Sequence, residues 1–328
     1  MLDNLPGNSV PGRNNRDYNL DILRGIAVVL MIFHHVVTWL YTGSIRDIFT
    51  IVGQISIGDI AAPIFFTVCG MSLYYSINAM KTEHMGTVNI LKKLAQRNMR
   101  LYLIGLVLCL VAFGHASFFY WGVLQSLAVV SILTGTLYLL PARKAVLLFT
   151  GLLALAGYYF FHPYAYLLPA KLARILLGDF SLVLLTGFLS IGLFMAIYVL
   201  TGNYKPHTIA AVGLLFMTLG LAGNFTGFLI TRFPASPSYM LFVVGLTVLM
   251  YAALLLAKTD GSYVYPAIWA GRNALNIFVV HYLVYIYGKH SGMVGSLNGF
   301  YSVLAALVIT AFFLLLGRWM SWPLRTSA

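Results

Sequence analysis

Long apolar runs separated by short polar segments constrain the fold of this chain more than any other feature. A helix of roughly 20 mainly apolar residues spans the hydrocarbon core of a bilayer, and within that core only helices and closed barrels satisfy their backbone polar groups. The runs therefore predict an all-α integral membrane protein, a bundle of about ten transmembrane helices. The predicted spans are 20–41, 50–77, 97–114, 118–140, 145–161, 175–201, 207–228, 237–257, 264–287 and 300–322.

The composition supports a membrane-embedded chain. Of the 328 residues, 60% are hydrophobic and only 9% are charged, whereas about 25% of the residues of a soluble domain are charged. We expect a single transmembrane domain at 20–322, with polar cytoplasmic tails at 1–19 and 323–328. The polar N-terminal tail is followed directly by a full-length apolar run, which indicates an uncleaved anchor and not a signal peptide.

The excess of basic residues indicates membrane topology. The formal net charge is +12, from 20 Lys and Arg against 8 Asp and Glu. The basic residues are spread between the apolar runs and do not cluster on one face. Nucleic-acid binding is therefore not expected. With the N-terminus in the cytoplasm, most basic residues fall on inner segments, so the positive-inside rule predicts two cytoplasmic termini in a multi-pass protein of the plasma or cell inner membrane.

Several kinds of site are absent from the sequence. Cys69 and Cys109 both lie inside apolar runs, which supports neither a disulfide framework nor a cysteine metal site. There is no His-Glu-x-x-His motif and no Cys/His cluster, so we predict no metal. A P-loop, a His-x4-Asp acyltransferase motif and a Gly-x-Ser-x-Gly nucleophile elbow are also missing.

Titratable side chains inside the first run are candidates for function, because charged groups cost several kcal/mol in hydrocarbon. Arg24 begins this run, and His35 follows eleven residues later, which places it about 16 Å deeper along a helix. Its neighbour His34 points about 100° away, and the composition does not choose between the two histidines. Taken alone, a histidine on an apolar helix is more often a packing residue than a catalytic one. Arg24, taken alone, is as often a simple cytoplasmic anchor as a functional residue.

Asp59 lies in the second run at a depth comparable with that of His35. An unpaired carboxylate at this depth is severely penalised, so Asp59 needs a partner. We expect that partner to be His35, because a carboxylate that bonds an imidazole fixes its tautomer and raises its basicity. The alternative is a structural aspartate that bonds helix backbone at a Pro63 kink.

The run 264–287 carries a third group of polar residues. His281 should lie toward the outer half of the membrane, near the depth of His35, with Arg272 and Asn273 nearer the cytoplasm. Hydrogen bonding between helices is the alternative role for Asn273 and for Asn276.

Two arginines precede the third run on the predicted cytoplasmic side. Arg97 and Arg100 are three residues apart, so both project from one helical face and are able to bind phosphate bidentately. Such a pair alone is most often a cytoplasmic anchor. A binding role is favoured because nothing else in the chain offers a phosphate site.

Several of these residues belong to short motifs that follow one another along the chain. The motifs are Leu20-Asp21-Ile22-Leu23-Arg24-Gly25-Ile26-Ala27 with His35, Asp59 to Pro63 with Phe65, Phe66 and Gly70, Arg97-x-x-Arg100, Gly122-Val123-Leu124-Gln125, and Gly271-Arg272-Asn273 with His281. Together they resemble the transmembrane acyltransferase superfamily, which includes acyltransferase family 3 and the heparan-alpha-glucosaminide N-acetyltransferase relatives.

The resemblance implies transfer of an acyl group, usually acetyl, from cytoplasmic acyl-CoA to a hydroxyl or amine of a sugar or glycan at the outer side. On this basis we predict that His35 deprotonates the acceptor or carries the acyl group, oriented by Asp59. Arg97 and Arg100 would bind the CoA phosphates. The remaining predicted site residues would assist with the phosphates, line the cavity or polarise the thioester. They are Arg24, Gln125, Arg272, Asn273 and His281. Membrane lipid is an expected partner, and a homo-oligomer is left open.

Two other classes of function remain as alternatives. A multi-span transporter or flippase, of a small polar solute or a lipid-linked glycan, would use buried polar groups equally well. Transporters often contain inverted repeats and interrupted helices, and we see no convincing halves. A non-enzymatic membrane component would leave His35, Asp59 and His281 without a role.

Overall fold

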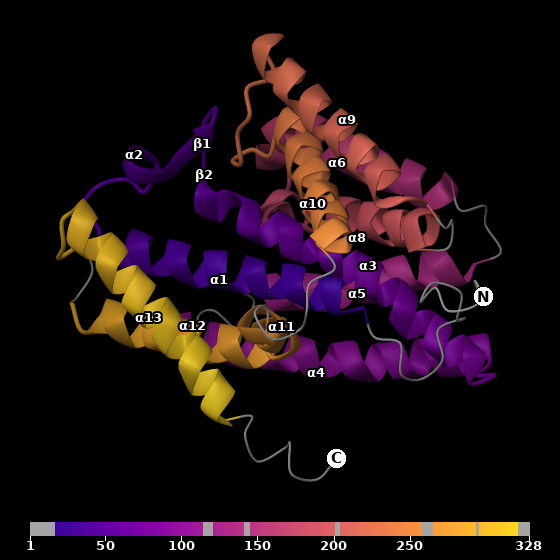
Figure 1. The fold of residues 1–328 in the computed structure, drawn as a ribbon, viewed down its shortest axis with the longest axis horizontal. Helices are drawn as coiled ribbons and strands as arrows, with labels where there is room; N and C mark the ends of the chain where they lie inside the picture. Colours follow the sequence, from indigo (N-terminus) through magenta and orange to yellow (C-terminus); the bar gives the residue numbers. More distant parts are fainter. Residues whose placement is uncertain are drawn as a thin grey trace. The chain divides into compact units, whose positions relative to one another are not determined.

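A computed structural model describes residues 17–113, 121–140, 145–200, 204–257, 265–292 and 295–320 (Figure 1). The structure is 83% helical, and a two-stranded hairpin is the only sheet within these ranges. The predicted all-helical architecture is thus confirmed. The predicted tails lie almost wholly outside the described residues.

Contacts between residues divide the chain into two compact units. The first unit comprises Met1–Asp17 and Phe66–Ile209, and the second comprises Tyr18–Phe65 and Ala210–Ala328. Helices α3 (Ala61–Thr82) and α9 (Pro206–Phe225) each begin in one unit and end in the other.

The second unit is built around α1 (Tyr18–Leu40), which packs against four other helices. These are α10 (Pro237–Ala257), α11 (Tyr265–Arg272), α12 (Ala274–His290) and α13 (Gly299–Met320). After α1 the chain forms the short α2 (Arg46–Phe49), the strands β1 (Thr50–Val52) and β2 (Ile55–Ser56), and the 3-10 helix η1 (Ile57–Ile60), and then enters α3.

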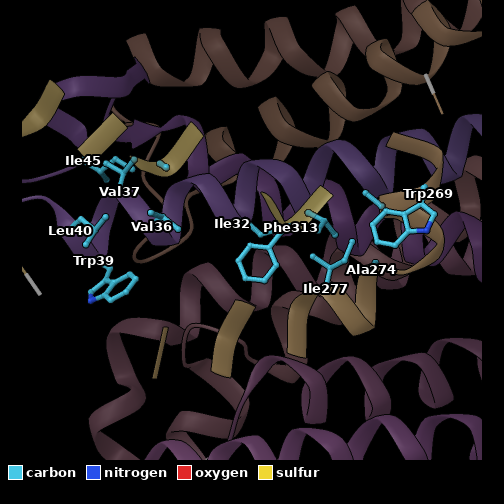
Figure 2. Packing of buried hydrophobic residues seen from close by; sticks show 13 residues of the cluster. Ile32, Val36, Val37, Trp39, Leu40, Ile45, Trp269, Ala274, Ile277 and Phe313 are labelled. Carbon is cyan, nitrogen blue, oxygen red and sulfur yellow. The ribbon is translucent and has the colours of Figure 1, made fainter. Parts of the chain in front are cut away.

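Apolar side chains on α1 form the core of this unit. Figure 2 shows a cluster of buried residues that follows the helix, with Trp269 near one end and Trp39 near the other. Ile32 lies between them and is fully buried, in the same cluster as Phe313 of α13 and Ile277 of α12. Burying this apolar surface fixes the rotation of α1 about its axis, and with it the direction of every polar side chain on the helix.

Two glycines allow α1 and α11 to pack with their backbones in contact. A Cβ atom at Gly25 would overlap the carbonyl oxygen of Ala267, and one at Gly271 would overlap the carbonyl oxygen of Asp21. Small residues of this kind are the usual means of close helix contact in membranes. Both glycines belong to motifs that stood out in the sequence, and their role here is to bring the two helices together.

Among its described residues, the first unit contains the rest of α3 and six further helical segments before α9. They are α4 (Thr87–Phe113), α5 (Val123–Leu139), α6 (Ala145–Phe161), the 3-10 helix η3 (His162–Leu167), α7 (Ala170–Leu177), and α8 (Leu182–Met195), which continues as the π-helix η4 (Ala196–Leu200). Helix α8 packs against α5 and α6, and α4 packs against α5.

Most predicted spans coincide with apolar helices. Within the part of the chain that the structure describes, seven helical segments are long and apolar enough to cross a membrane, and three shorter apolar helices lie at Val123–Leu139, Ala274–Gly288 and Gly299–Leu315. The number of crossings and the side on which each terminus lies stay predictions, as does the single transmembrane domain.

Three predicted spans are wrong in detail. The run 50–77 starts with the β1–β2 hairpin, where Gly53 has a φ of 57°, so helical structure begins only at η1. The run 175–201 is divided between α7 and α8, because Ser181 caps a new helix by accepting a hydrogen bond from the Leu184 amide at 2.9 Å. The run 264–287 is interrupted at Asn273, between α11 and α12.

Candidate functional site

Two histidines from distant parts of the sequence face each other in the second unit. His35 lies on α1 and His281 on α12, with 3.0 Å between Nδ1 of His35 and Nε2 of His281. Their ring centroids are 5.3 Å apart and their ring planes differ by only 14°. The centroid separation is close to the nitrogen–nitrogen distance plus two ring radii, so the rings lie end to end in a nearly common plane. The structure thus brings together two predicted site residues.

The two rings of this histidine pair differ in their surroundings. His281 is 3% exposed, lies beside the rings of Phe278 and Phe313, and has its Nδ1 at 3.1 Å from the carbonyl oxygen of Ile277. His35 is only half-buried. Taken as a whole residue, His35 is therefore less completely buried than His281.

His34 points away from the histidine pair. Its ring packs over Gly58 of η1, where a Cβ atom would overlap the imidazole. The centroids of the His34 and His35 rings are 6.0 Å apart. His34 Nδ1 is a buried atom with no hydrogen-bond partner among the described residues. Of the two adjacent histidines, His35 is the one that contacts His281 on α12, and the functional role of each stays a prediction.

Asp59 does not bond His35, so that prediction is wrong. Its Oδ1 accepts a hydrogen bond from Nη1 of Arg232 at 2.7 Å, and its Oδ2 accepts from the amide and hydroxyl of Ser56 at 2.7 Å and 2.9 Å. The physical reason is the rotation of about 100° between adjacent helical residues, which turns His34 and not His35 toward η1. Asp59 thus has the partner that its burial requires, but the partner is an arginine.

No motif or periodic pattern in the sequence pointed to Arg232 as that partner. It lies between α9 and α10, and its guanidinium stacks over the ring of Phe233 at 4.5 Å. Its segment is tied down by hydrogen bonds from the Ile230 amide to the Asn224 side chain and from the Gln54 amide to the Ile230 carbonyl. Only the need of Asp59 for a counter-ion pointed to such a residue.

A second charged cluster joins α1 to α11. The carboxylate of Asp21 is fully buried and lies 2.7 Å from Nη1 of Arg24 and 3.3 Å from Nε of Arg272. Arg24 also donates to the carbonyl oxygen of Gly271 at 3.4 Å. Two residues predicted to bind the donor therefore share one carboxylate, that of Asp21, a motif residue for which no role was predicted.

Asn273 occupies the break between α11 and α12. Its side-chain amide donates to the carbonyl oxygen of Trp269 at 3.0 Å, four residues back. This bond is local. The alternative predicted for Asn273, a hydrogen bond to another packed helix, is not seen among the described residues.

The first unit holds the remaining predicted site residues. Arg97 and Arg100 are both exposed on α4, and Arg97 donates to the Ser76 hydroxyl at 2.9 Å. Gln125 is 2% exposed and donates to Sγ of Cys109 at 3.3 Å. The arginines are therefore accessible to a ligand, whereas Gln125 is part of the packed interior of this unit.

Clusters that could hold a metal ion are not found in the described ranges, where no group of three or more His, Cys, Asp or Glu side chains meets. The absence of a metal from the reaction stays a prediction.

The sequence of the chain is similar to that of a known protein family. It matches the model of the family described as heparan-alpha-glucosaminide N-acetyltransferase, catalytic, over residues 16–202 of 328. A search of curated proteins found no match. The matched range covers more than half of the chain and includes His35 and Asp59, and it confirms the resemblance seen in the motifs. The chain therefore belongs to the heparan-alpha-glucosaminide N-acetyltransferase family of transmembrane acetyltransferases.

Proposed function

We propose that the protein transfers an acetyl group from cytoplasmic acetyl-CoA to an amine or hydroxyl of a sugar or glycan at the outer side of the membrane. The observation that carries this proposal is the family match over 16–202, because the family is one of acetyltransferases that act on a glucosaminide. The half-buried imidazole of His35 within that range supplies a group suited to the chemistry.

His35 acts as the general base of the transfer. Its imidazole takes the proton from the acceptor hydroxyl or amine while the acceptor oxygen or nitrogen attacks the thioester carbonyl carbon. The new bond forms as the carbon–sulfur bond breaks, and the proton passes from the imidazole to the leaving sulfur to give free CoA thiol. Histidine is suited to this exchange because it gains and loses a proton near neutral pH.

The donor binds through the basic face of α4. Arg97 and Arg100 are exposed and project from one side of the helix, and guanidinium groups bind phosphate oxygens bidentately. We assign Arg24 and Arg272 a different role, because both lie against the buried Asp21 carboxylate and hold α1 against α11. Gln125 and Asn273 likewise serve the packing of their helices.

The direction of transfer rests on the proposed topology. The distribution of Lys and Arg supports ten crossings with both termini in the cytoplasm, within a single transmembrane domain of the plasma membrane. In this orientation the arginines of α4 lie toward the cytoplasmic side of the membrane, where acetyl-CoA is available. His35 lies deeper in the membrane.

An acceptor assay tests the proposal. The purified protein in lipid nanodiscs is incubated with acetyl-CoA labelled in its acetyl group, together with methyl α-glucosaminide or methyl α-glucoside. We expect labelled N-acetyl product from the first sugar or O-acetyl product from the second, with equal release of CoA thiol. Failure to release thiol above the protein-free rate with both sugars would contradict the proposal and favour a transporter.

A further inference from the structure

The carbonyl oxygen of Ile277 determines which nitrogens of the histidine pair carry hydrogens. A carbonyl oxygen only accepts hydrogen bonds. Because His281 Nδ1 lies 3.1 Å from this oxygen, Nδ1 must carry a hydrogen and donate it. The backbone of α12 thereby determines which nitrogen of His281 is protonated.

The other nitrogen of His281 is then an acceptor. The His281 ring is 3% exposed, lies among aromatic rings, and has no carboxylate partner among the described residues. An imidazolium in such surroundings would be a buried charge without compensation. A neutral imidazole with a hydrogen on Nδ1 has a lone pair on Nε2.

His35 completes the chain of hydrogen bonds. Its Nδ1 lies 3.0 Å from the His281 Nε2 lone pair, so Nδ1 carries a hydrogen and donates it. The nearly common plane of the two rings, with 14° between them, is the geometry that such a bond requires, because both the N–H and the lone pair lie in their ring planes. The remaining nitrogen of His35, Nε2, makes no hydrogen bond within the described residues.

We infer that His281 is a positioning residue that holds His35 in the Nδ1–H tautomer, so that the Nε2 lone pair of His35 is the atom that reacts. The inference deepens the proposed function and rests on it. It differs from the roles predicted for His281 from the sequence, because His281 acts here through His35 and touches neither the thioester nor the acceptor.

The same arrangement stabilises the protonated form that appears during transfer. When Nε2 takes the acceptor proton, His35 becomes an imidazolium, and its Nδ1–H bond to His281 becomes charge-assisted and stronger. The proton then leaves Nε2 for the CoA sulfur, and the original tautomer returns. Other groups near His35 are the Tyr285 ring at 6.2 Å and the His34 ring at 6.0 Å, and neither forms a hydrogen bond with it.

Three substitutions at position 281 separate positioning from packing. The amide oxygen of His281→Gln reaches the place of Nε2 and still accepts from His35, whereas the shorter His281→Asn reaches only the place of Nδ1. His281→Leu fills space without an acceptor. We expect kcat to fall at least about tenfold in the Asn and Leu variants, as when an orienting partner is lost, with KM for acetyl-CoA little changed and most of kcat retained in the Gln variant.

A spectroscopic measurement reads the tautomer directly. The protein, which contains eight histidines, is labelled with 13C and 15N histidine in lipid, and His35→Ala identifies the His35 signals. The wild-type and His281→Gln proteins should show His35 protonated at Nδ1, and His281→Leu should lose that preference.

Each outcome separates this inference from the function on which it rests. A His35 hydrogen on Nε2 in the wild-type protein, or equal kcat in the Gln and Leu variants, would overturn the positioning role even in an active enzyme. An Nδ1–H tautomer in a protein that releases no CoA thiol would overturn the proposed function and leave the proton order standing.

Discussion

Two adjacent histidines on α1 have different roles because a helix turns about 100° between neighbouring residues. His35 meets His281 on α12, while His34 packs over Gly58 of η1. The apolar core decides which histidine faces which partner, because it fixes the rotation of α1. A substitution that rotates the helix would therefore disturb both contacts together.

The Asp59–Arg232 pair leads to a prediction about stability. Asp59→Ala leaves the guanidinium of Arg232, whose side chain is only 19% exposed, without its counter-ion, which typically costs about 3–5 kcal/mol. The double variant Asp59→Leu with Arg232→Met should recover a large part of this loss, because no charge is left unpaired. Thermal unfolding in detergent measures both effects.

An exposed ion pair provides the control. Glu83 and Lys93 lie 3.8 Å apart with side chains that are 44% and 54% exposed, so Glu83→Ala should cost about 0–1 kcal/mol. Equal losses from Asp59→Ala and Glu83→Ala, or a loss in the double variant as large as that of Asp59→Ala, would show that the buried pair contributes no special stability.

The arginines of α4 lead to a prediction about donor binding. Arg97→Gln with Arg100→Gln removes the proposed phosphate ligands, so KM for acetyl-CoA should rise by at least about tenfold, the equivalent of one lost charge-assisted hydrogen bond of about 1.5 kcal/mol. The value of kcat should change little. Arg174→Gln on α7, an exposed arginine of the same unit, is the matched control. An unchanged KM in the double variant would remove α4 from the donor site.

The sequence predicted which residues of the site are polar and how deep they lie, but not all of their partners. His35 and His281 were expected at one depth, and the structure places them in contact. Asp59 was paired with the wrong group because a sequence gives the position of a residue along a helix but not the direction of its side chain. Its true partner is 173 positions away, in a connecting segment where no periodic pattern exists.

At the scale of helices, the close contact of α1 with α11 depends on Gly25. A Cβ atom there would overlap the Ala267 carbonyl oxygen, so Gly25→Ala must push the two helices apart. We expect a melting temperature several degrees lower and reduced activity, because Asp21 and Arg272 would also separate. Activity and thermal unfolding on the same preparation check this.

Gly157 on α6 is a suitable control for that change. A Cβ atom there meets only the Phe161 ring at 3.9 Å, and alanine is the better helix former by up to about 1 kcal/mol. Gly157→Ala should therefore leave the melting temperature unchanged or raise it slightly. A loss of stability equal to that of Gly25→Ala would mean that the α1–α11 contact is not what the glycine provides.

The apolar runs predicted the helices better than the interruptions within them. Helix α6 has the bounds expected for the run 145–161. In the run 175–201, however, a cap at Ser181 starts a new helix, and in the run 50–77 a hairpin precedes the helix. Hydrophobicity measures burial in apolar surroundings and is insensitive to such local hydrogen bonding, so breaks inside apolar segments escape it.

At the scale of the whole molecule, the predicted topology can be tested by labelling within the first unit. Cysteine is introduced at Gly86, between α3 and α4, where a side chain meets no atom within 4 Å, or at Tyr166 in η3, which is 78% exposed. Cys69 and Cys109 are first replaced by alanine. A membrane-impermeant thiol reagent added to intact cells should label Tyr166→Cys, whereas Gly86→Cys should react only after the membrane is opened. The reverse pattern would contradict cytoplasmic termini.

The role of His35 in acyl transfer is the central claim, and one comparison of rates tests it most directly. Release of CoA thiol from acetyl-CoA in the presence of a sugar acceptor is measured for the wild-type protein, for His35→Ala and for His290→Ala. His290 also has its Nδ1 close to a carbonyl oxygen four residues back on α12, at 2.8 Å, but lies outside the histidine pair. We predict a loss of about 10²-fold or more for His35→Ala, the usual contribution of a general base, and near wild-type release for His290→Ala. Equal rates in all three proteins would contradict the account.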